Sequence, residues 1–112
     1  MINQLRIYEI PTDNLGPFHD RFRDQAQPIF ARHGFRILAM WDSTRDGKTF
    51  FIYLLAWRDE AEMKAAWEAF MADEEWAEIK RVTGAKHGTM VNGIEDHVLT
   101  PTSYSAAITG EP

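Results

Sequence analysis

Hydrophobic residues run without interruption from Phe50 to Trp57. Neither alternating set in this run contains a charged side chain, so a strand formed from it must bury both of its faces. Helices of the same chain can cover one face of the sheet, but 112 residues provide too few helices to cover both. The pattern therefore predicts that a second copy of the chain covers the other face.

Alternation of apolar and polar residues predicts three further strands. They cover residues 2–10, 35–42 and 90–99, and Pro11 and Pro101 stop the first and the last of them. Asp46 and Gly47 lie between the second strand and the apolar run. This dipeptide is typical of tight hairpin turns, so we expect these two strands to pair.

Apolar residues recur at helical spacing from Leu15 onwards, and the first helix is expected to end at Gly34. Pro28 lies late in this segment. Because proline has no amide hydrogen to donate to the carbonyl of Asp24, we expect the helix to kink or break at Pro28.

A second helical segment follows the apolar run. Asp59 is expected to cap its start, and Asp73 offers a second cap, so we expect a bend near Ala72. Gly84 is expected to end the segment, since glycine commonly terminates helices.

The order strand, helix, strand, strand, helix, strand is that of an α+β ferredoxin-like subunit, βαββαβ, with a four-stranded antiparallel sheet. One face of such a sheet carries no helices. Two subunits that join these faces form a dimeric α+β barrel. We expect one domain over residues 1–100 and a polar C-terminal tail over residues 101–112.

Composition narrows the function classes. The chain has 12 Lys and Arg against 17 Asp and Glu, a formal net charge of −5, and its basic residues form no cluster, so we expect no nucleic-acid partner. It has no cysteine, and its four histidines are scattered, so we expect no metal site and no cofactor. Since no apolar run is long enough to span a membrane, we expect a cytoplasmic protein without a membrane partner.

Several short motifs together resemble those of the NIPSNAP family, within the wider dimeric α+β barrel superfamily. The resemblance covers residues 3 to about 104 and is carried by Leu5–Glu9, Pro28–Phe30, Arg32–Gly34, Trp41, Tyr53–Trp57, Ala66–Phe70, Asp73, Trp76 and Leu99–Thr102. It implies a dimer of ferredoxin-like subunits. Relatives in the superfamily include cofactor-free monooxygenases, haem-degrading enzymes and small isomerases, so the resemblance leaves open whether the chain is an enzyme.

Alternation also predicts which side chains share the helix-free face. We expect Leu5 and Ile7 beneath the helices, because the other set of the first strand, Arg6 and Tyr8, is more polar. On the last strand the same reasoning places Ile94 and Val98 beneath the helices and Glu95 and His97 on the opposite face.

The first strand of a ferredoxin-like sheet lies between the third and the fourth, so Tyr8, Tyr53 and His97 are expected to meet on the barrel side. An imidazole beside two phenols could transfer protons near neutral pH, which makes these three residues the catalytic candidates. The alternative is that Tyr8, Glu95 and His97 form a hydrogen-bond network that only sets the dimer geometry.

Six further residues are candidates for ligand binding: Arg6, Trp41, Trp57, Glu95, His19 and Arg23. Arg6 could balance an anionic ligand. The indoles of Trp41 and Trp57 suit flat or apolar ligands, whereas Trp67 and Trp76 are expected in the core. His19 and Arg23 follow at an interval of four and could rim a cavity entrance, although such a stripe is usually a solvated helix face.

The leading hypothesis is a homodimer that binds a small, partly apolar molecule in the barrel of each subunit. Two alternatives remain. The first is an enzyme of the cofactor-independent monooxygenase or isomerase kind, and the second is a protein-interaction module, which would require a large exposed apolar patch.

Overall fold

A tight hairpin joins the two longest strands, β2 (Arg36–Arg45) and β3 (Lys48–Trp57). Its two loop residues, Asp46 and Gly47, have φ angles of 54° and 74°, the left-handed backbone that a two-residue hairpin turn requires. The hairpin prediction is therefore confirmed, and both strands begin or end closer to the turn than the sequence pattern indicated.

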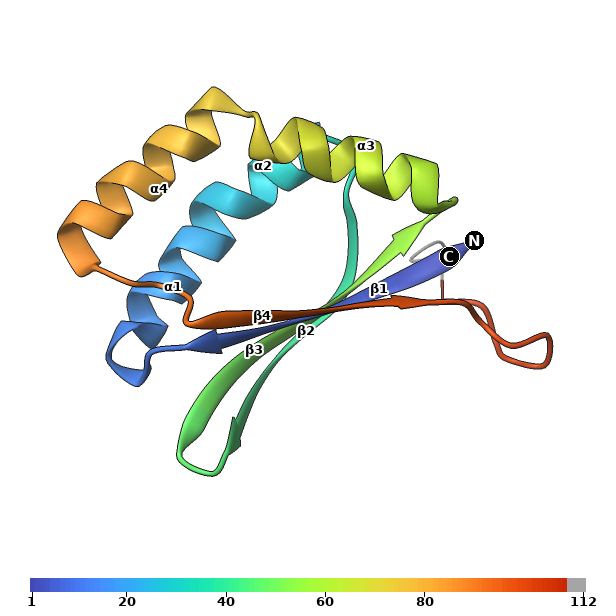
Figure 1. The fold of residues 1–112 in the computed structure, drawn as a ribbon, viewed down its shortest axis with the longest axis horizontal. Helices are drawn as coiled ribbons and strands as arrows, with labels where there is room; N and C mark the ends of the chain where they lie inside the picture. Colours follow the sequence, from blue (N-terminus) through green and yellow to red (C-terminus); the bar gives the residue numbers. More distant parts are fainter. Residues whose placement is uncertain (109–112) are drawn as a thin grey trace.

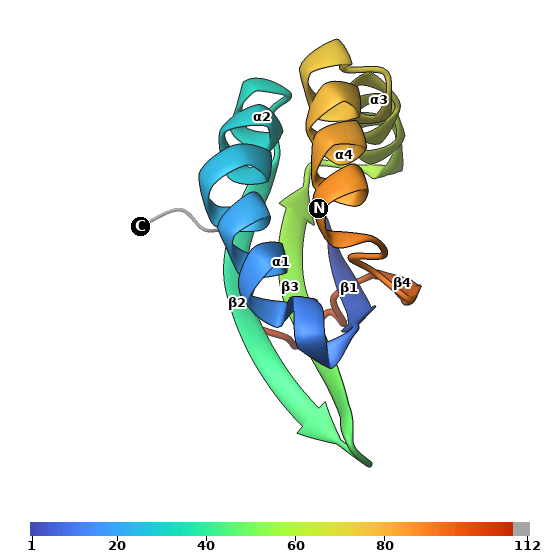
Figure 2. The ribbon, with the colours of Figure 1, turned by 90° about the vertical axis from the view of Figure 1, so that its left-hand side faces the viewer.

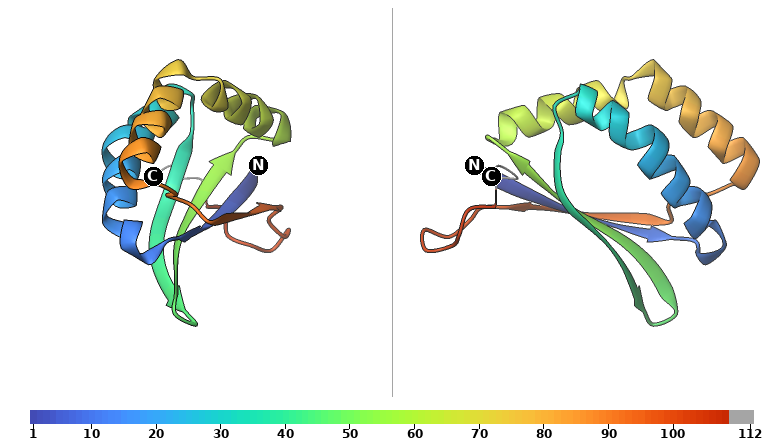
Figure 3. Two further views of the ribbon diagram at one scale, coloured as in Figure 1. Left: turned by 60° about the vertical axis from the view of Figure 1, so that its left-hand side comes forward. Right: turned by 180° about the vertical axis from the view of Figure 1, so that it is seen from behind.

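The computed structural model describes residues 1–108, and its four strands form one antiparallel sheet. β1 (Ile2–Ile10) lies between β3 and β4 (Gly93–Leu99), so the strand order is β2-β3-β1-β4. All helices lie on one face of this sheet and leave the other face bare (Figures 1 and 3). The predicted ferredoxin-like α+β fold is confirmed.

The first helical segment is continuous from Thr12 to Arg32. It consists of a short 3₁₀ turn, η1 (Thr12–Asn14), then α1 (Leu15–Arg21), a π-helical turn, η2 (Phe22–Ala26), and α2 (Gln27–Arg32). Pro28 lies in the first turn of α2, directly after the wider π turn, and the break that the sequence allowed at this residue does not occur. A π turn changes the hydrogen-bond pattern ahead of the proline, so the helix continues without a break.

The second helical segment is split as predicted. α3 (Glu60–Met71) begins after Asp59, whose carboxylate accepts a hydrogen bond from the Glu62 amide at 2.8 Å. α4 (Glu74–His87) begins after Asp73, which accepts one from the Trp76 amide at 3.0 Å. The expectation that Gly84 ends this segment is wrong, because α4 continues to His87.

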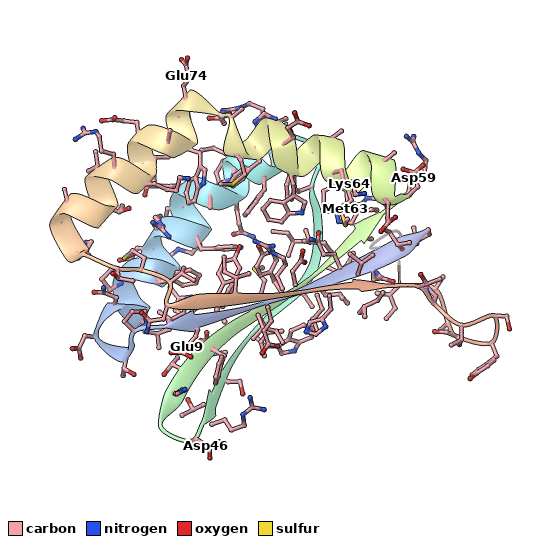
Figure 4. All side chains as sticks on the ribbon, viewed as in Figure 1. Glu9, Asp46, Asp59, Met63, Lys64 and Glu74 are labelled. Atoms are coloured by element: carbon pink, nitrogen blue, oxygen red, sulfur yellow. The ribbon has the colours of Figure 1, made fainter. Side chains whose placement is uncertain are left out.

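The helices form two arms over the sheet. α1, η2 and α2 make one arm, and α3 and α4 make the other, beside it (Figure 2). Side chains fill the layer between the arms and the sheet, whereas Glu74 and Asp46 point outwards (Figure 4). Met63 lies on the inner side of α3 and is buried.

The chain after β4 returns to the bare face of the sheet. The side-chain amide of Asn3 donates to the backbone carbonyl of Ile108 at 3.2 Å, so this segment covers one end of the face. Residues 109–112 of the predicted tail lie outside the described part of the chain. Among the described residues, no helix is long and apolar enough to cross a membrane.

Candidate functional site

A cavity of about 430 Å³ lies between the sheet and the two helical arms. β1 and β4 contribute to its floor, and residues from α1, η2, α2, α3 and α4 contribute to its walls. Seven aromatic side chains line it: Tyr8, Phe18, Phe22, Phe30, Trp67, Phe70 and Trp76. Its volume and apolar lining are those of a binding site for a small molecule.

Ring contacts between the two arms hold the cavity walls in place. Phe30 of α2 and Phe70 of α3 stack with centroids 4.2 Å apart and planes inclined by 17°. Phe70 also contacts Trp76 of α4, with centroids 5.2 Å apart. These contacts connect three helices, and they follow from the helical spacing of the aromatic residues.

The polar group at the floor consists of Arg6, Tyr8 and Tyr53. The two phenol oxygens lie 2.5 Å apart, and the guanidinium of Arg6 donates to both, from Nη2 to Tyr8 at 3.2 Å and from Nε to Tyr53 at 3.4 Å. Arg6 and Tyr8 line the cavity, whereas Tyr53 lies behind them without solvent exposure. The β1–β3 register, which places Arg6 opposite Tyr53, makes this arrangement.

Burial and neighbouring charges define the ionisation of this group. Burial raises the pKa of the Tyr53 phenol well above its ordinary value, Tyr8 adds to the shift, and Arg6 opposes it. For Arg6, burial disfavours the charge, but the phenol oxygens of Tyr8 and Tyr53 outweigh it and raise the pKa of the guanidinium. At neutral pH, Tyr53 is therefore a neutral phenol and Arg6 a cation.

Two more cations line the cavity. Arg21 of α1 lies over the ring of Trp76, with its guanidinium carbon 5.2 Å from the centroid, and donates to the hydroxyl of Thr83 at 3.1 Å. Lys80 of α4 lies on the same ring, with Nζ 5.9 Å from the centroid. Burial lowers the pKa of Arg21, although an arginine stays protonated at neutral pH. Neither cation forms an ion pair with a carboxylate among residues 1–108.

A gap in the side chains of α4 opens the cavity near Gly84. Trp76, Lys80 and Gly84 follow at intervals of four, so they share one stripe of the helix. Gly84 lines the cavity, and a Cβ atom added there would meet no other atom within 4 Å.

The sequence-based assignment of the two sheet faces is wrong for β1. Tyr8 contacts Phe18 of α1 with ring centroids 6.1 Å apart, and Arg6 lies over the ring of Trp67 of α3 at 4.3 Å, so both face the helices. Leu5 and Ile7 face away from them. The polar tips of Arg6, Tyr8 and Tyr53 bond to one another, which removes the cost of burying them beneath helices.

The predicted meeting of His97 with the two tyrosines does not occur within the chain. Tyr8 and Tyr53 come together, but the register places His97 opposite Leu5 and Glu95 opposite Ile7, on the helix-free face. His97 is exposed, and its ring nitrogen lies 3.4 Å from a carboxylate oxygen of Glu95. The sheet faces predicted for the residues of β4 were right. Tyr8, however, faces the helices, so it lies on the opposite side of the sheet from His97.

Two of the four tryptophans, Trp41 and Trp57, do not line a pocket as predicted. Trp57 is fully buried in the core, where its indole donates to Gln4 at 2.9 Å, and Trp41 is 49% exposed on the helix-free face. Trp76 lies in the core as expected and Trp67 packs against it, and both also line the cavity. Gln4, which the sequence analysis did not single out, also accepts from the Trp67 indole at 2.8 Å.

His19 and Arg23 do not line the cavity between the sheet and the helices. They lie on a smaller groove of about 220 Å³ on the other side of the helix. The ring of His19 bonds to Asp42 at 3.0 Å, and Arg23 forms ion pairs with Asp20 and Asp24. Their stripe of the helix is thus paired with neighbouring side chains.

Two cavity residues were missed, and their spacing could have identified both. Arg21 follows Phe18 by three positions and Lys80 follows Trp76 by four, so each cation shares a helix face with a buried aromatic residue.

Among the residues that the structure describes, no group of three or more His, Cys, Asp or Glu side chains lies close enough to hold a metal ion.

Comparisons with known proteins give the same family as the sequence motifs. The family model described as NIPSNAP matches residues 3–106. No curated protein matches the chain significantly. An uncharacterised NIPSNAP domain protein from Burkholderia xenovorans has a similar structure, with a TM-score of 0.79 at 18% sequence identity, covering 96% of this chain and 100% of that one.

Two further structures extend the comparison. A NIPSNAP family protein of unknown function from Agrobacterium tumefaciens has a TM-score of 0.79 at 14% identity, covering 94% of this chain and 91% of that one. An antibiotic biosynthesis monooxygenase has a TM-score of 0.57 at 13% identity, covering 91% and 99%. At these identities the likeness concerns the fold alone.

Proposed function

The chain belongs to the NIPSNAP family, and we propose that it binds a small, largely apolar molecule in the cavity between its sheet and its helices. The observation that carries this proposal is the cavity itself, about 430 Å³ in volume and lined by seven aromatic rings with a few converging polar groups. The ligand then lies within one subunit, on the face of the sheet opposite to the one that the sequence pattern indicated.

The proposal includes a homodimer formed through the helix-free face. Leu5, Ile7, Ile52 and Leu54 lie together on this face, because the register pairs Leu5 with Leu54 and Ile7 with Ile52. A contiguous apolar surface of this kind is typical of an interface between subunits. A second copy that covers it leaves the ligand cavity unobstructed on the other side of the sheet.

A second candidate function is cofactor-independent oxygenation or isomerisation. The observation in its favour is the Arg6–Tyr8–Tyr53 group, whose donors could stabilise an oxyanion inside an aromatic cavity. Such chemistry also needs a group that accepts a proton from the substrate. The described residues that line the cavity include no carboxylate and no imidazole, which favours binding over proton abstraction.

The test of the proposed function is a fluorescence titration with N-phenyl-1-naphthylamine, a neutral apolar dye. We expect it to bind with a stoichiometry of one per chain. Gly84→Phe extends an aromatic ring from α4 towards the open cavity and should weaken dye binding about tenfold or more, since it removes the space that the dye occupies.

The matched control is Gly84→Ala. It should leave dye binding unchanged and raise the free energy of unfolding by about 0.5–1 kcal/mol, because alanine is the better helix former at an interior position. Equal dye affinities of Gly84→Phe and the unmodified chain, or no dye binding at all, would contradict the proposed function.

A further inference from the structure

The hydroxyl hydrogens of Tyr8 and Tyr53 indicate what the cavity binds. Two phenols 2.5 Å apart share one hydrogen bond, so one hydroxyl donates to the other. Arg6 donates to both phenol oxygens and can accept nothing. The hydroxyl hydrogen of the accepting phenol therefore has no acceptor within this group. No other acceptor for it exists among residues 1–108.

Burial determines which of the two phenols has the hydroxyl hydrogen without an acceptor. Tyr53 has no solvent exposure and does not line the cavity, so its hydroxyl can donate only to Tyr8. The opposite orientation would leave the Tyr53 hydrogen unsatisfied in the core, which is strongly unfavourable. The raised pKa of Tyr53 keeps this phenol protonated and able to donate. The hydroxyl of Tyr8 thus points its hydrogen into the cavity.

Donation to Tyr8 strengthens Tyr8 as a donor in turn. Its oxygen accepts from a neutral phenol and from a guanidinium, and hydrogen bonds in such chains polarise one another. An oxygen acceptor with negative charge would bind best at this point.

The charges that face the cavity select the same kind of ligand. Arg6 on β1, Arg21 on α1 and Lys80 on α4 line it, and no carboxylate does so among the described residues. Asp96 on β4 is the carboxylate paired with Arg6, at 3.7 Å, and it does not line the cavity. The remaining cations, Arg21 and Lys80, have no carboxylate partner in the described chain.

We propose that the ligand is an aromatic or conjugated compound with one ionised oxygen, a phenolate or an enolate, which accepts a hydrogen bond from Tyr8. A single hydroxyl donor suits a single oxygen atom, and the rings of Phe30, Phe70 and Trp76 suit a flat conjugated body. This inference rests on the proposed function, because it names the ligand class of the same cavity.

The experiment uses 4-nitrophenol, whose phenolate is coloured and which ionises near neutral pH. Absorbance at the phenolate band is followed against pH with and without excess protein. We expect the pKa of bound 4-nitrophenol to fall by about one unit or more, which corresponds to about tenfold tighter binding of the phenolate than of the phenol. The comparison compound is 4-nitroanisole, the methyl ether, which cannot ionise and should bind more weakly at pH 8.

Tyr8→Phe removes the donor and should weaken phenolate binding about tenfold while changing the affinity for 4-nitroanisole about twofold or less. Tyr104→Phe is the control, because Tyr104 is 89% exposed and lies outside the cavity. Lys80→Gln leaves the Tyr8–Tyr53 pair intact and should reduce the pKa shift of 4-nitrophenol, which provides a second measurement if Tyr8→Phe folds poorly.

An unchanged or raised pKa of bound 4-nitrophenol, or an equal affinity for 4-nitroanisole, overturns the inference. In that case N-phenyl-1-naphthylamine should still bind and still be excluded by Gly84→Phe, so the proposed function would stand without the phenolate assignment. Failure of all three compounds to bind overturns both.

Discussion

One buried amide organises the polar contacts of an otherwise aromatic core. The side-chain oxygen of Gln4 accepts hydrogen bonds from the indoles of Trp57 and Trp67, and its nitrogen donates to Asp96 at 2.8 Å. Gln4 is almost completely buried. Two large indoles can therefore lie under the helices without an unsatisfied N–H group.

Gln4→Leu should lower the free energy of unfolding by about 2 kcal/mol, because it leaves the indole hydrogens of Trp57 and Trp67 without an acceptor. Urea denaturation measures the change. Gln25→Leu is the control, since Gln25 is exposed on η2 and the same substitution there should change stability by less than about 0.5 kcal/mol. Equal stabilities of the two variants would show that the Gln4 contacts contribute nothing.

The junction between α3 and α4 depends on Asp73. One carboxylate oxygen caps the amide of Trp76, and the other bonds to His33 at 2.8 Å and to Arg32 at 2.6 Å. Asp73 thus fixes the start of α4 and connects it to the end of α2. These hydrogen bonds, first that from His33 and then those from Arg32 and the Trp76 amide, hold the pKa of Asp73 well below its ordinary value of 3.8.

This pKa shift predicts how stability depends on pH. A carboxylate whose pKa is lower in the folded state stabilises the fold fully above its unfolded pKa and loses this contribution as the pH falls through the folded value. Asp73→Asn should therefore reduce the thermal midpoint at pH 7, and the difference from the unmodified chain should shrink below about pH 4. Asp13→Asn is the control, because Asp13 is exposed and forms no ion pair among the described residues.

Thermal unfolding between pH 2 and pH 8 measures both variants. A difference between Asp73→Asn and the unmodified chain that stays constant over this range would contradict a role for the ionised carboxylate. Equal midpoints at pH 7 would contradict it as well, because asparagine also provides the capping hydrogen bond.

The molecule as a whole has two unlike faces. Helices and the cavity occupy one side of the sheet, and the other side is bare apart from the end that the segment before Ile108 covers (Figures 1 and 3). Ile52 lies near the middle of the bare side, between Ile7 on β1 and Trp41 on β2. We propose that a second copy of the chain covers the bare side.

Ile52→Asp should convert the dimer into a folded monomer. A charge without a partner in a closed interface costs about 3–5 kcal/mol, whereas in the monomer the same charge remains partly exposed to water. Light scattering at micromolar concentration should report twice the chain mass for the unmodified protein and the single chain mass for Ile52→Asp. Ala77→Asp, on the exposed side of α4, should stay dimeric, and a monomeric unmodified chain would refute the interface.

Local chemistry could be inferred from the residues alone. Asp46 and Gly47 predict the hairpin turn, and Asp59 and Asp73 predict the starts of α3 and α4, because these features depend on neighbours in the chain. The order of the elements then predicts the fold. The π turn was missed, although it lies directly before Pro28. The continuation of α4 past Gly84 was missed because helix packing can override the tendency of glycine to end a helix.

The choice of sheet face required the folded chain. Arg6 and Tyr8 are polar, and alternation on β1 alone favours leaving them outside the helical layer. Tyr8 is buried and Arg6 is largely buried because Tyr53, far away in sequence, brings its hydroxyl to within 2.5 Å of that of Tyr8, and Arg6 donates to both. Whether a polar group can be buried depends on partners that only the three-dimensional register brings near, so the position of the cavity could not be derived from the periodicity of single strands.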